Sequence, residues 1–301
     1  MAEHMREAHP GGEVGELLAW DTRFFGRRIG RLRGKTADRE LLARARLWCR
    51  EQSIDCLYFL ADAGDAATAA LAEADGFRLV DLRVTLEGGV EAAADPHPPA
   101  GSGPGSAPRE GDPAAGPPPA IVRAAVERDI PALRRIAAAS HHDSRFYSDP
   151  HFTRPRCDEL YATWIENSCR AGQATAVLVA ELPDQRDGPA GYITCQLVDF
   201  DPPPERGPQK GDGGARAGQG QIGLFAVARG AQGHGVGGLL IASARRWFAA
   251  RGVWRLSVVT QGRNVRAQRI YQRHGLVTRS VELWYHKWFR QGEVEPDWSA
   301  G

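Results

Sequence analysis

The chain has 301 residues, a formal net charge of +1 and five cysteines without a CxxC pair. That length suits two modest domains, and the near-zero charge argues against nucleic acid or an anionic membrane as the main partner. The scattered cysteines argue against a disulfide framework or a zinc site, and they indicate a reducing compartment.

Residues 1–15 are polar and glycine-rich, and we expect a disordered tail there. They lack the apolar segment of a signal peptide, and no apolar run in the chain reaches membrane-spanning length. These features favour a cytoplasmic protein without membrane insertion.

A first domain is expected over residues 16–90. Residues 17–20 and 29–32 predict short strands around a polar-aromatic turn. The amphipathic pattern of residues 40–52 predicts a helix, and the dense β-branched and aromatic run 54–60 predicts a buried strand. An alanine-rich helix over 65–74, ended by Gly76, and a strand over 77–86 complete this domain.

The composition changes abruptly over residues 91–120. This Pro/Gly/Ala-rich segment has no Ile, Leu, Val, Met or aromatic residue and holds nine of the twenty prolines. Because it cannot bury a core, we predict a flexible linker between two domains. Residues 201–220 also lack large apolar side chains and predict a flexible insert in the second domain.

The second domain is expected over residues 121–290, before a tail over 291–301. It opens with a strand over 121–125 and a helix through residue 139, with Asp129 as its N-cap. Residues 141–156 predict a loop whose aromatic and charged side chains suit a binding surface. A helix over 158–170 and a strand hairpin over 174–182 and 192–200 follow.

Residues 222–250 are the most informative stretch. The apolar run 222–227 predicts a buried strand, a glycine cluster follows, and apolar residues then recur at helical spacing. A strand, a glycine-rich turn and a helix N-terminus together form an anion site, because the first amides of a helix lack partners. A strand over 256–260, a helix over 264–273 and a strand region over 276–289 end the domain.

The order of elements in residues 29–86 resembles that in residues 222–288, which is consistent with a duplication. The first copy lacks the glycine cluster, so we do not expect it to bind phosphate. A structural or homodimer-forming role suits it better.

Two nucleotide-binding motifs fail at the glycines. Gly233, Gly235 and Gly238 fit G-x-G-x-x-G, but no Asp or Glu occurs from Gly252 to Val281 to hold a ribose. A P-loop needs a lysine after its glycines, and none follows here.

A third pattern does fit. Residues 232–237 match Q-x-x-G-x-G, and a later helix matches N-x-x-A-x-x-x-Y-x-x-x-G-[FL] at Asn264, Ala267, Tyr271, Gly275 and Leu276. With the apolar strand before the glycines, residues 121–289 resemble the GNAT superfamily of N-acetyltransferases. The resemblance implies an α/β (α+β) fold with a central mixed sheet, preceded by a smaller, incomplete GNAT-like domain.

The segments 144–147, 164–170 and 258–264, and the N-terminal LLAWDTRFFG, are similar to nucleotide-sugar N-acetyltransferases. In that family the acceptor is the amine of a dTDP-linked 4-amino-4,6-dideoxygalactose. The linker and the insert depart from the family. They leave open another small-molecule or protein amine as acceptor, or a non-catalytic acyl-CoA-binding module.

The resemblance implies acetyl-CoA as co-substrate and direct attack of the amine on the thioester. Tyr271 would be the general acid that protonates the thiolate, and Asn264 would hold the pantetheine arm or a water beside it. The implied donor site comprises the strand edge Phe225, Ala226 and Val227 and the pyrophosphate turn Gln232, Gly233, His234, Gly235, Val236, Gly237 and Gly238.

The acceptor side is less defined. Ser144, Arg145 and Tyr147 are candidates for acceptor contact, since Arg binds phosphate with two hydrogen bonds. No metal is expected, because the adjacent His141 and His142 point apart in most conformations. Spacing identifies no general base: Asp199, Glu282 and a water relay all remain open.

Overall fold

The computed structural model describes residues 14–90, 120–183, 187–198 and 218–289. Nearly all of the predicted linker and most of the predicted 201–220 insert lie outside these ranges, as do the predicted tails apart from residues 14 and 15. Asp199 lies outside them as well. No helix within these ranges is both long and apolar enough to cross a membrane.

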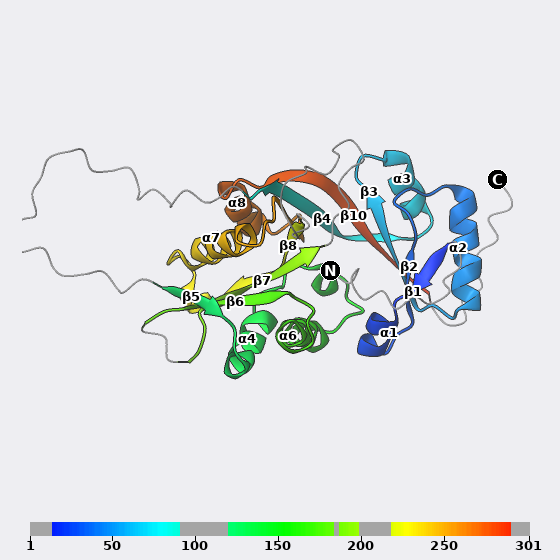
Figure 1. The fold of residues 1–301 in the computed structure, drawn as a ribbon. Helices are drawn as coiled ribbons and strands as arrows, with labels where there is room; N and C mark the ends of the chain where they lie inside the picture. Colours follow the sequence, from blue (N-terminus) through cyan, green and yellow to red (C-terminus); the bar gives the residue numbers. More distant parts are fainter. Residues whose placement is uncertain (1–13, 91–119, 184–186, 199–217, 290–301) are drawn as a thin grey trace, which may run out of the picture.

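The described residues build one mixed sheet of ten strands, in the order β1-β2-β3-β10-β4-β9-β8-β7-β6-β5 (Figure 1). The pairs β2–β3 and β8–β9 are parallel, which confirms the predicted mixed sheet. The strands are β1 (Gly15–Leu17), β2 (Ile29–Leu32), β3 (Cys56–Asp62), β4 (Arg78–Gly89), β5 (Ile121–Ala124), β6 (Ala176–Glu181), β7 (Gly191–Val198), β8 (Gln219–Val227), β9 (Arg255–Gln261) and β10 (Val277–Trp288). The helices are α1 (Ala19–Phe25), α2 (Arg39–Glu51), α3 (Ala66–Ala74), α4 (Ile130–Ala138), α5 (Arg145–Ser148), α6 (Arg154–Arg170), α7 (Val236–Ala249) and α8 (Val265–Arg273).

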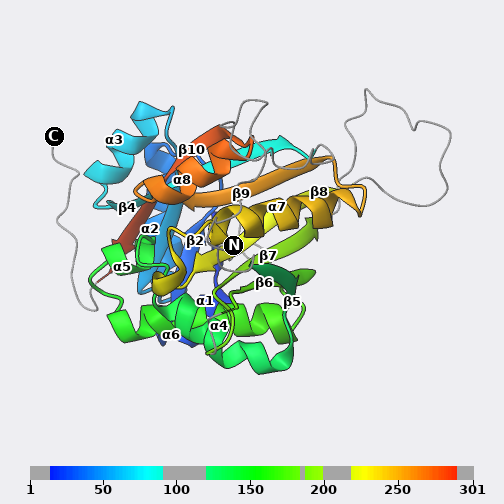
Figure 2. The same ribbon diagram turned by 90° about the vertical axis from the view of Figure 1, so that its left-hand side faces the viewer.

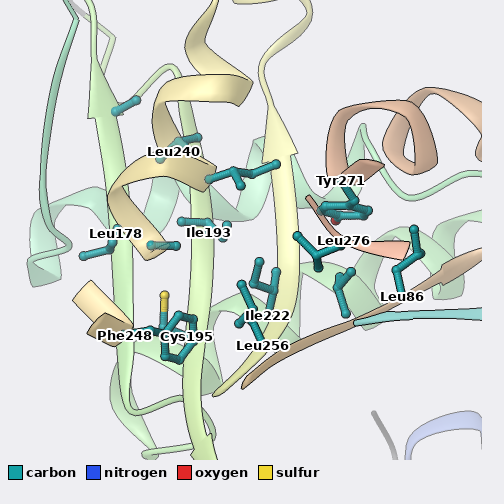
Figure 3. Close-up of a cluster of buried hydrophobic side chains, with 14 of the residues drawn as sticks. Leu86, Leu178, Ile193, Cys195, Ile222, Leu240, Phe248, Leu256, Tyr271 and Leu276 are labelled. Carbon is teal, nitrogen blue, oxygen red and sulfur yellow. The ribbon is translucent and has the colours of Figure 1, made fainter. Parts of the chain in front are cut away.

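Helices cover both faces of the sheet around β7 and β8 (Figure 2). On one face, Leu240 and Phe248 of α7 are fully buried in a cluster with Ile193, Ile222 and Leu256 of the strands (Figure 3). Burial of each such side chain stabilises the fold by about 1.5–3 kcal/mol. Helices α4 and α6 pack on the opposite face in a second cluster.

Strand β10 lies between β3 and β4 and is antiparallel to both (Figure 1). Trp284 pairs with Leu60 on one side and with Asp81 on the other. Strand β4 pairs in turn with β9. Strands from both predicted domains therefore form one continuous sheet.

Most predicted elements are confirmed. The hairpin β6–β7, the strands β9 and β10 and the helix α8 begin and end within two residues of their predicted limits. Asp129 precedes α4 as predicted, but its carboxylate accepts hydrogen bonds from Arg123 and from the Val126 amide rather than from α4. Strand β8 begins at Gln219, inside the predicted insert.

The predicted strand and turn over residues 17–26 are wrong, because α1 occupies most of this segment. Trp20 and Phe24 lie one helical turn apart and stack with ring centroids 5.0 Å apart, and Trp20 also stacks on Trp164 of α6. Gly26 ends the helix in the left-handed region. Aromatic residues at i and i+4 before a glycine were the helical signal.

The loop predicted over residues 141–156 is also partly wrong. It contains α5 and the first turn of α6, where Pro155 occupies an early helical position that tolerates proline. Arg145, Phe146 and Phe152 are buried rather than solvated. This segment therefore packs between the sheet and α6 instead of forming an open surface loop.

Candidate functional site

Strands β8 and β9 separate halfway along their length. Their parallel pairing runs from Gln219 opposite Arg255 to Ile222 opposite Val258, and it stops there. Beyond that point β9 continues beside β4, and β8 continues beside β7. Within the described part of the chain, the β9-facing edge of residues 223–227 therefore has no strand partner.

A β-bulge lies where the two strands separate. The pairing of β7 with β8 shifts between Ile193 and Cys195, so Gly223 and Leu224 together oppose Thr194. A bulge bends its strand and increases the local twist. The bulge in β8 therefore accounts for its divergence from β9.

The bulge also sets the direction of the next amides. The Leu224 amide donates to Thr194 Oγ1 at 2.7 Å, and the Ala228 amide donates to a carbonyl just before β7 at 2.8 Å. Because strand amides alternate in direction, those of Phe225 and Val227 point away from β7. Two backbone donors thus face the opening between the strands.

The predicted pyrophosphate turn leads from β8 into α7. Gly233 and Gly235 have φ of +88° and +78°, a region that favours glycine, and Gly235 is the N-cap of α7. The first amides of this 14-residue helix, those of Val236, Gly237 and Gly238, have no carbonyl of their own helix to bind. They form a ready site for an anion.

Gln232 and Gly237 have structural roles in this turn. The Gln232 Nε2 donates to the Val227 carbonyl at 3.1 Å, and its Oε1 accepts from Arg266 at 2.6 Å. A Cβ atom on Gly237 would lie 2.9 Å from the Ile270 Cδ1, so a larger residue here would displace the Ile270 side chain between α7 and α8. His234, by contrast, is exposed.

Asn264 and Tyr271 lie at the start and near the end of α8. Asn264 is its N-cap and accepts from the Ala267 amide at 3.0 Å. The Tyr271 ring lies 6.0 Å from that of Phe225 and belongs to the cluster beneath α7 (Figure 3). Burial raises the pKa of Tyr271 above its usual value, so its hydroxyl keeps its proton at neutral pH.

A pocket of about 140 Å³ opens beside these groups. Its lining comes from both sequence halves: Arg31, Asp81, Arg83, His141, Ser144, Arg145, Phe146, Tyr161, Trp164, Gly223, Leu224, Phe225, Val259, Thr260, Gln261, Asn264, Ala267, Tyr271 and Trp284. A larger hollow of about 560 Å³ lies beyond His286 and Asp149, and neither Tyr271 nor Asn264 lines it. The smaller pocket is therefore the candidate active site.

Arg145 is held rigidly in this pocket. Its guanidinium lies 4.2–4.3 Å from the ring centroids of Tyr58, Phe146 and Trp284, and it donates to His286 Nε2 at 3.2 Å. Because guanidinium nitrogens only donate, His286 must accept at Nε2 and carry its proton on Nδ1. No carboxylate of the described residues lies within ion-pair distance of Arg145.

His286 is anchored in turn by Asp149. Its Nδ1 donates to Asp149 Oδ2 at 2.6 Å, and Trp288 donates to the same oxygen at 2.8 Å. Burial lowers the pKa of His286 to about 4, although the contact with Asp149 opposes that shift. The imidazole is therefore neutral at physiological pH.

The structure brings some predicted site residues together and separates others. Ser144, Arg145, Phe225, Asn264 and Tyr271 line the same pocket. Tyr147 does not line the pocket, and its hydroxyl donates to Asp158 at 2.7 Å. The turn over residues 232–238 is also absent from the lining.

Sequence reasoning missed the pocket residues of the first half, Arg31, Asp81 and Arg83. Alternation over the predicted strand 77–86 did place Asp81 and Arg83 on one face. Whether this face of β4 lies toward the pocket depends on the pairing of β4 with β10 and β9, and the local pattern does not reveal that pairing.

Glu282, one proposed base, is only 2% exposed and is paired with Lys35 at 2.6 Å and with Arg83 at 3.3 Å. Its carboxylate therefore already has two cationic partners. The described residues contain no group of three or more His, Cys, Asp or Glu side chains arranged to hold a metal ion.

Comparisons with known proteins agree with this geometry. Residues 136–276 match the family model described as "Acetyltransferase (GNAT) family". The chain is 31% identical over 165 residues to the dTDP-fucosamine acetyltransferase of Escherichia coli O6:H1, which covers 54% of this chain and 61% of that protein. It is 26% identical over 160 residues to the spore coat polysaccharide biosynthesis protein SpsD of Bacillus subtilis, and this match covers 53% of this chain and 48% of SpsD. The matches span less than two thirds of either relative.

Among solved structures, a GCN5-related N-acetyltransferase from Sphaerobacter thermophilus is similar, with a TM-score of 0.53 and 16% identity. The match covers 93% of this chain and 77% of that one. At this identity the likeness shows the fold alone, and it confirms the predicted fold class.

Proposed function

We propose that this protein is an acetyltransferase of the GNAT type that transfers the acetyl group of acetyl-CoA to the amine of a nucleotide-linked amino sugar, since residues 136–276 match that family model. The observation that carries the proposal is the opening between β8 and β9, which adjoins a pocket that Tyr271 lines.

The donor would bind along the free edge of β8. The pantetheine arm carries amide groups, and the inward amides of Phe225 and Val227 are the donors available to it. The pyrophosphate would lie on the α7 N-terminus, where the positive end of the helix dipole favours an anion. Binding at both places would fix the thioester next to the pocket.

The chemistry proposed is direct attack of the amine on the thioester carbonyl. A β8 amide that faces the developing oxyanion would contribute a few kcal/mol. Tyr271 would give its proton to the departing thiolate, and its raised pKa means that the phenol is protonated and available at neutral pH.

The proposed acceptor class has two supports. The Escherichia coli relative is named for action on dTDP-fucosamine. In this chain, Arg145 presents a buried guanidinium whose charge no carboxylate of the described residues neutralises directly, between aromatic rings that suit a sugar or base. A diphosphate bound there would supply the missing negative charge.

The test is an assay of the purified protein with acetyl-CoA and a panel of nucleotide amino sugars that includes dTDP-4-amino-4,6-dideoxyhexoses, with free thiol as readout. Turnover is expected on at least one 4-amino-4,6-dideoxyhexose. Turnover confined to amines without a nucleotide would contradict the acceptor class. Calorimetric CoA binding with no turnover on any amine would contradict the transferase itself.

A further inference from the structure

The pocket contains one carboxylate. Among the described residues that line it, Asp81 of β4 is the only Asp or Glu, and it is 5% exposed. Tyr271 and Asn264 line the same pocket from the donor side. The acidic side chain thus lines the same small pocket as the group proposed to release the thiol.

The Asp81 carboxylate is oriented by backbone amides, including that of Arg145, and has one long ion pair. Its Oδ1 accepts from the Leu82 amide at 2.8 Å, while the Arg263 Nε stays 3.9 Å away from the same oxygen. Arg263 is itself held by the Val80 carbonyl at 2.9 Å and by Ser148 Oγ at 2.5 Å. The guanidinium therefore cannot close on Asp81 without losing those contacts.

The neighbouring candidates for proton transfer are occupied or weakly basic. Glu282 is paired with Lys35 and Arg83. His141 also lines the pocket, but burial lowers its pKa to about 4, and its Nε2 lies 3.0 Å from the Tyr192 hydroxyl. Among these described groups, Asp81 is the carboxylate that lines the pocket, and its one ion pair is long.

We propose that Asp81 accepts the proton that the acceptor's ammonium group must lose before it attacks acetyl-CoA. The inference rests on the proposed function and names its missing base. The ammonium gives one proton to the carboxylate, and the free amine forms the C–N bond as the C–S bond breaks. The thiolate takes its proton from Tyr271, which regains one from the attacking nitrogen. Asp81 then releases its proton to solvent, so one amide, one thiol and one proton result.

The electrostatic surroundings suit this role. Burial raises the pKa of Asp81 to about 6, against the opposing effects of the Leu82 amide, Arg263 and Arg145. A carboxylate with that pKa is a stronger base than an ordinary Asp and is still ionised at neutral pH. The other charged or titratable groups around it are Arg31 of β2, Arg83 of β4, Glu282 of β10, His141, Tyr161 and Tyr271.

The test compares the wild type with Asp81→Asn, using acetyl-CoA and dTDP-fucosamine. At pH 7.5 the variant should lose kcat by about 100-fold or more, while its calorimetric Kd for CoA stays within about twofold. The wild-type kcat/KM should show a break near pH 6, below which it falls. That break should be absent in the variant, whose residual rate should rise steadily with pH as the amine deprotonates unaided. Asp81→Glu, which keeps a carboxylate, should restore part of the rate, and its pH profile should again show a break at acidic pH.

Asp75→Asn is the matched control, because Asp75 is a mostly buried carboxylate outside the pocket, paired with Lys287. It should keep the wild-type rate and pH profile. If Asp81→Asn does not fold, as judged by its melting curve, Asp81→Glu and Asp81→Ser decide: equal rates for the two would overturn the assignment. If Asp81→Asn keeps the wild-type kcat and the break near pH 6, Asp81 is not the base, and the proposed function is unaffected. A wild type inactive on every amine would overturn the proposed function, and the assignment with it.

Discussion

At the scale of single residues, the site combines groups that the sequence motif identified with groups that only the structure shows. The motif located Tyr271 and Asn264, since their spacing along one helix is local. It did not locate Asp81, which reaches the pocket through the pairing of β4 with β9 and β10. Short-range patterns therefore predicted the proposed donor side together with Ser144 and Arg145, whereas the contribution of β2 and β4 to the pocket depends on long-range pairing.

Tyr271→Phe tests the proposed general acid. Loss of the hydroxyl removes the proton for the thiolate while the ring keeps its contact with Phe225, so kcat should fall about 100-fold. Calorimetry should show nearly unchanged CoA binding. A variant with wild-type kcat would exclude Tyr271 as the acid.

Because the folded protein keeps His286 neutral, we expect its free energy of unfolding to fall in acid. The pKa of His286 is depressed to about 4 from an ordinary value near 6.5, so its contribution is fully present above about pH 6.5 and is lost as the pH falls toward 4. At pH 5 the native state should lose on the order of 2 kcal/mol from this group.

Urea unfolding at pH 7.5 and pH 5 measures this loss. His286→Gln can still accept from Arg145 and donate to Asp149 but does not titrate, so it should show a smaller difference between the two pH values. An equal difference in both proteins would contradict the role given to His286.

At the scale of elements, the turn between β8 and α7 was predicted well, because glycine spacing and helical periodicity are local signals. Helix α1 was not predicted, because its aromatic residues were interpreted as a turn. The donor-binding edge of β8 at residues 225–227 was implied only by the family resemblance. That edge is freed by the bulge at Gly223 and Leu224, for which the glycine within the apolar run was an overlooked signal.

Gly237→Val tests the close packing of α7 on α8. Its Cβ would lie 2.9 Å from the Ile270 Cδ1 and 3.3 Å from the Phe225 Cζ, and the two methyl groups of valine add to this crowding, so we expect these side chains and the helix N-terminus to shift. The KM for acetyl-CoA should rise about tenfold or more, since roughly 1.4 kcal/mol of lost anion binding is a factor of ten. Gly230→Ala is the control, because a Cβ there meets nothing within 4 Å. Equal KM values for the two variants would contradict the packing argument.

At the scale of the whole molecule, the order of elements was readable from the sequence, but their arrangement in one sheet was not. A strand region over 276–289 was predicted, and β10 occupies it, yet the place of β10 between β3 and β4 depends on partners far away in the chain. We expect residues 14–90 to be unfolded as an isolated fragment, because β3 and β4 both pair with β10 rather than with each other. Circular dichroism of this fragment checks the expectation, and a cooperative melt would contradict it.

The central position of β10 also has a consequence for protein synthesis. Strands β3 and β4 leave the ribosome early, whereas their shared partner begins only at Val277. At about 5–20 residues per second, the nascent chain waits on the order of ten seconds or more for that strand after β4 is complete. During this time both edges expose unpaired backbone groups that other chains can bind. The protein is therefore most prone to aggregate while it is being made, and a chaperone that shields nascent strands should raise its yield more than one that rescues finished chains.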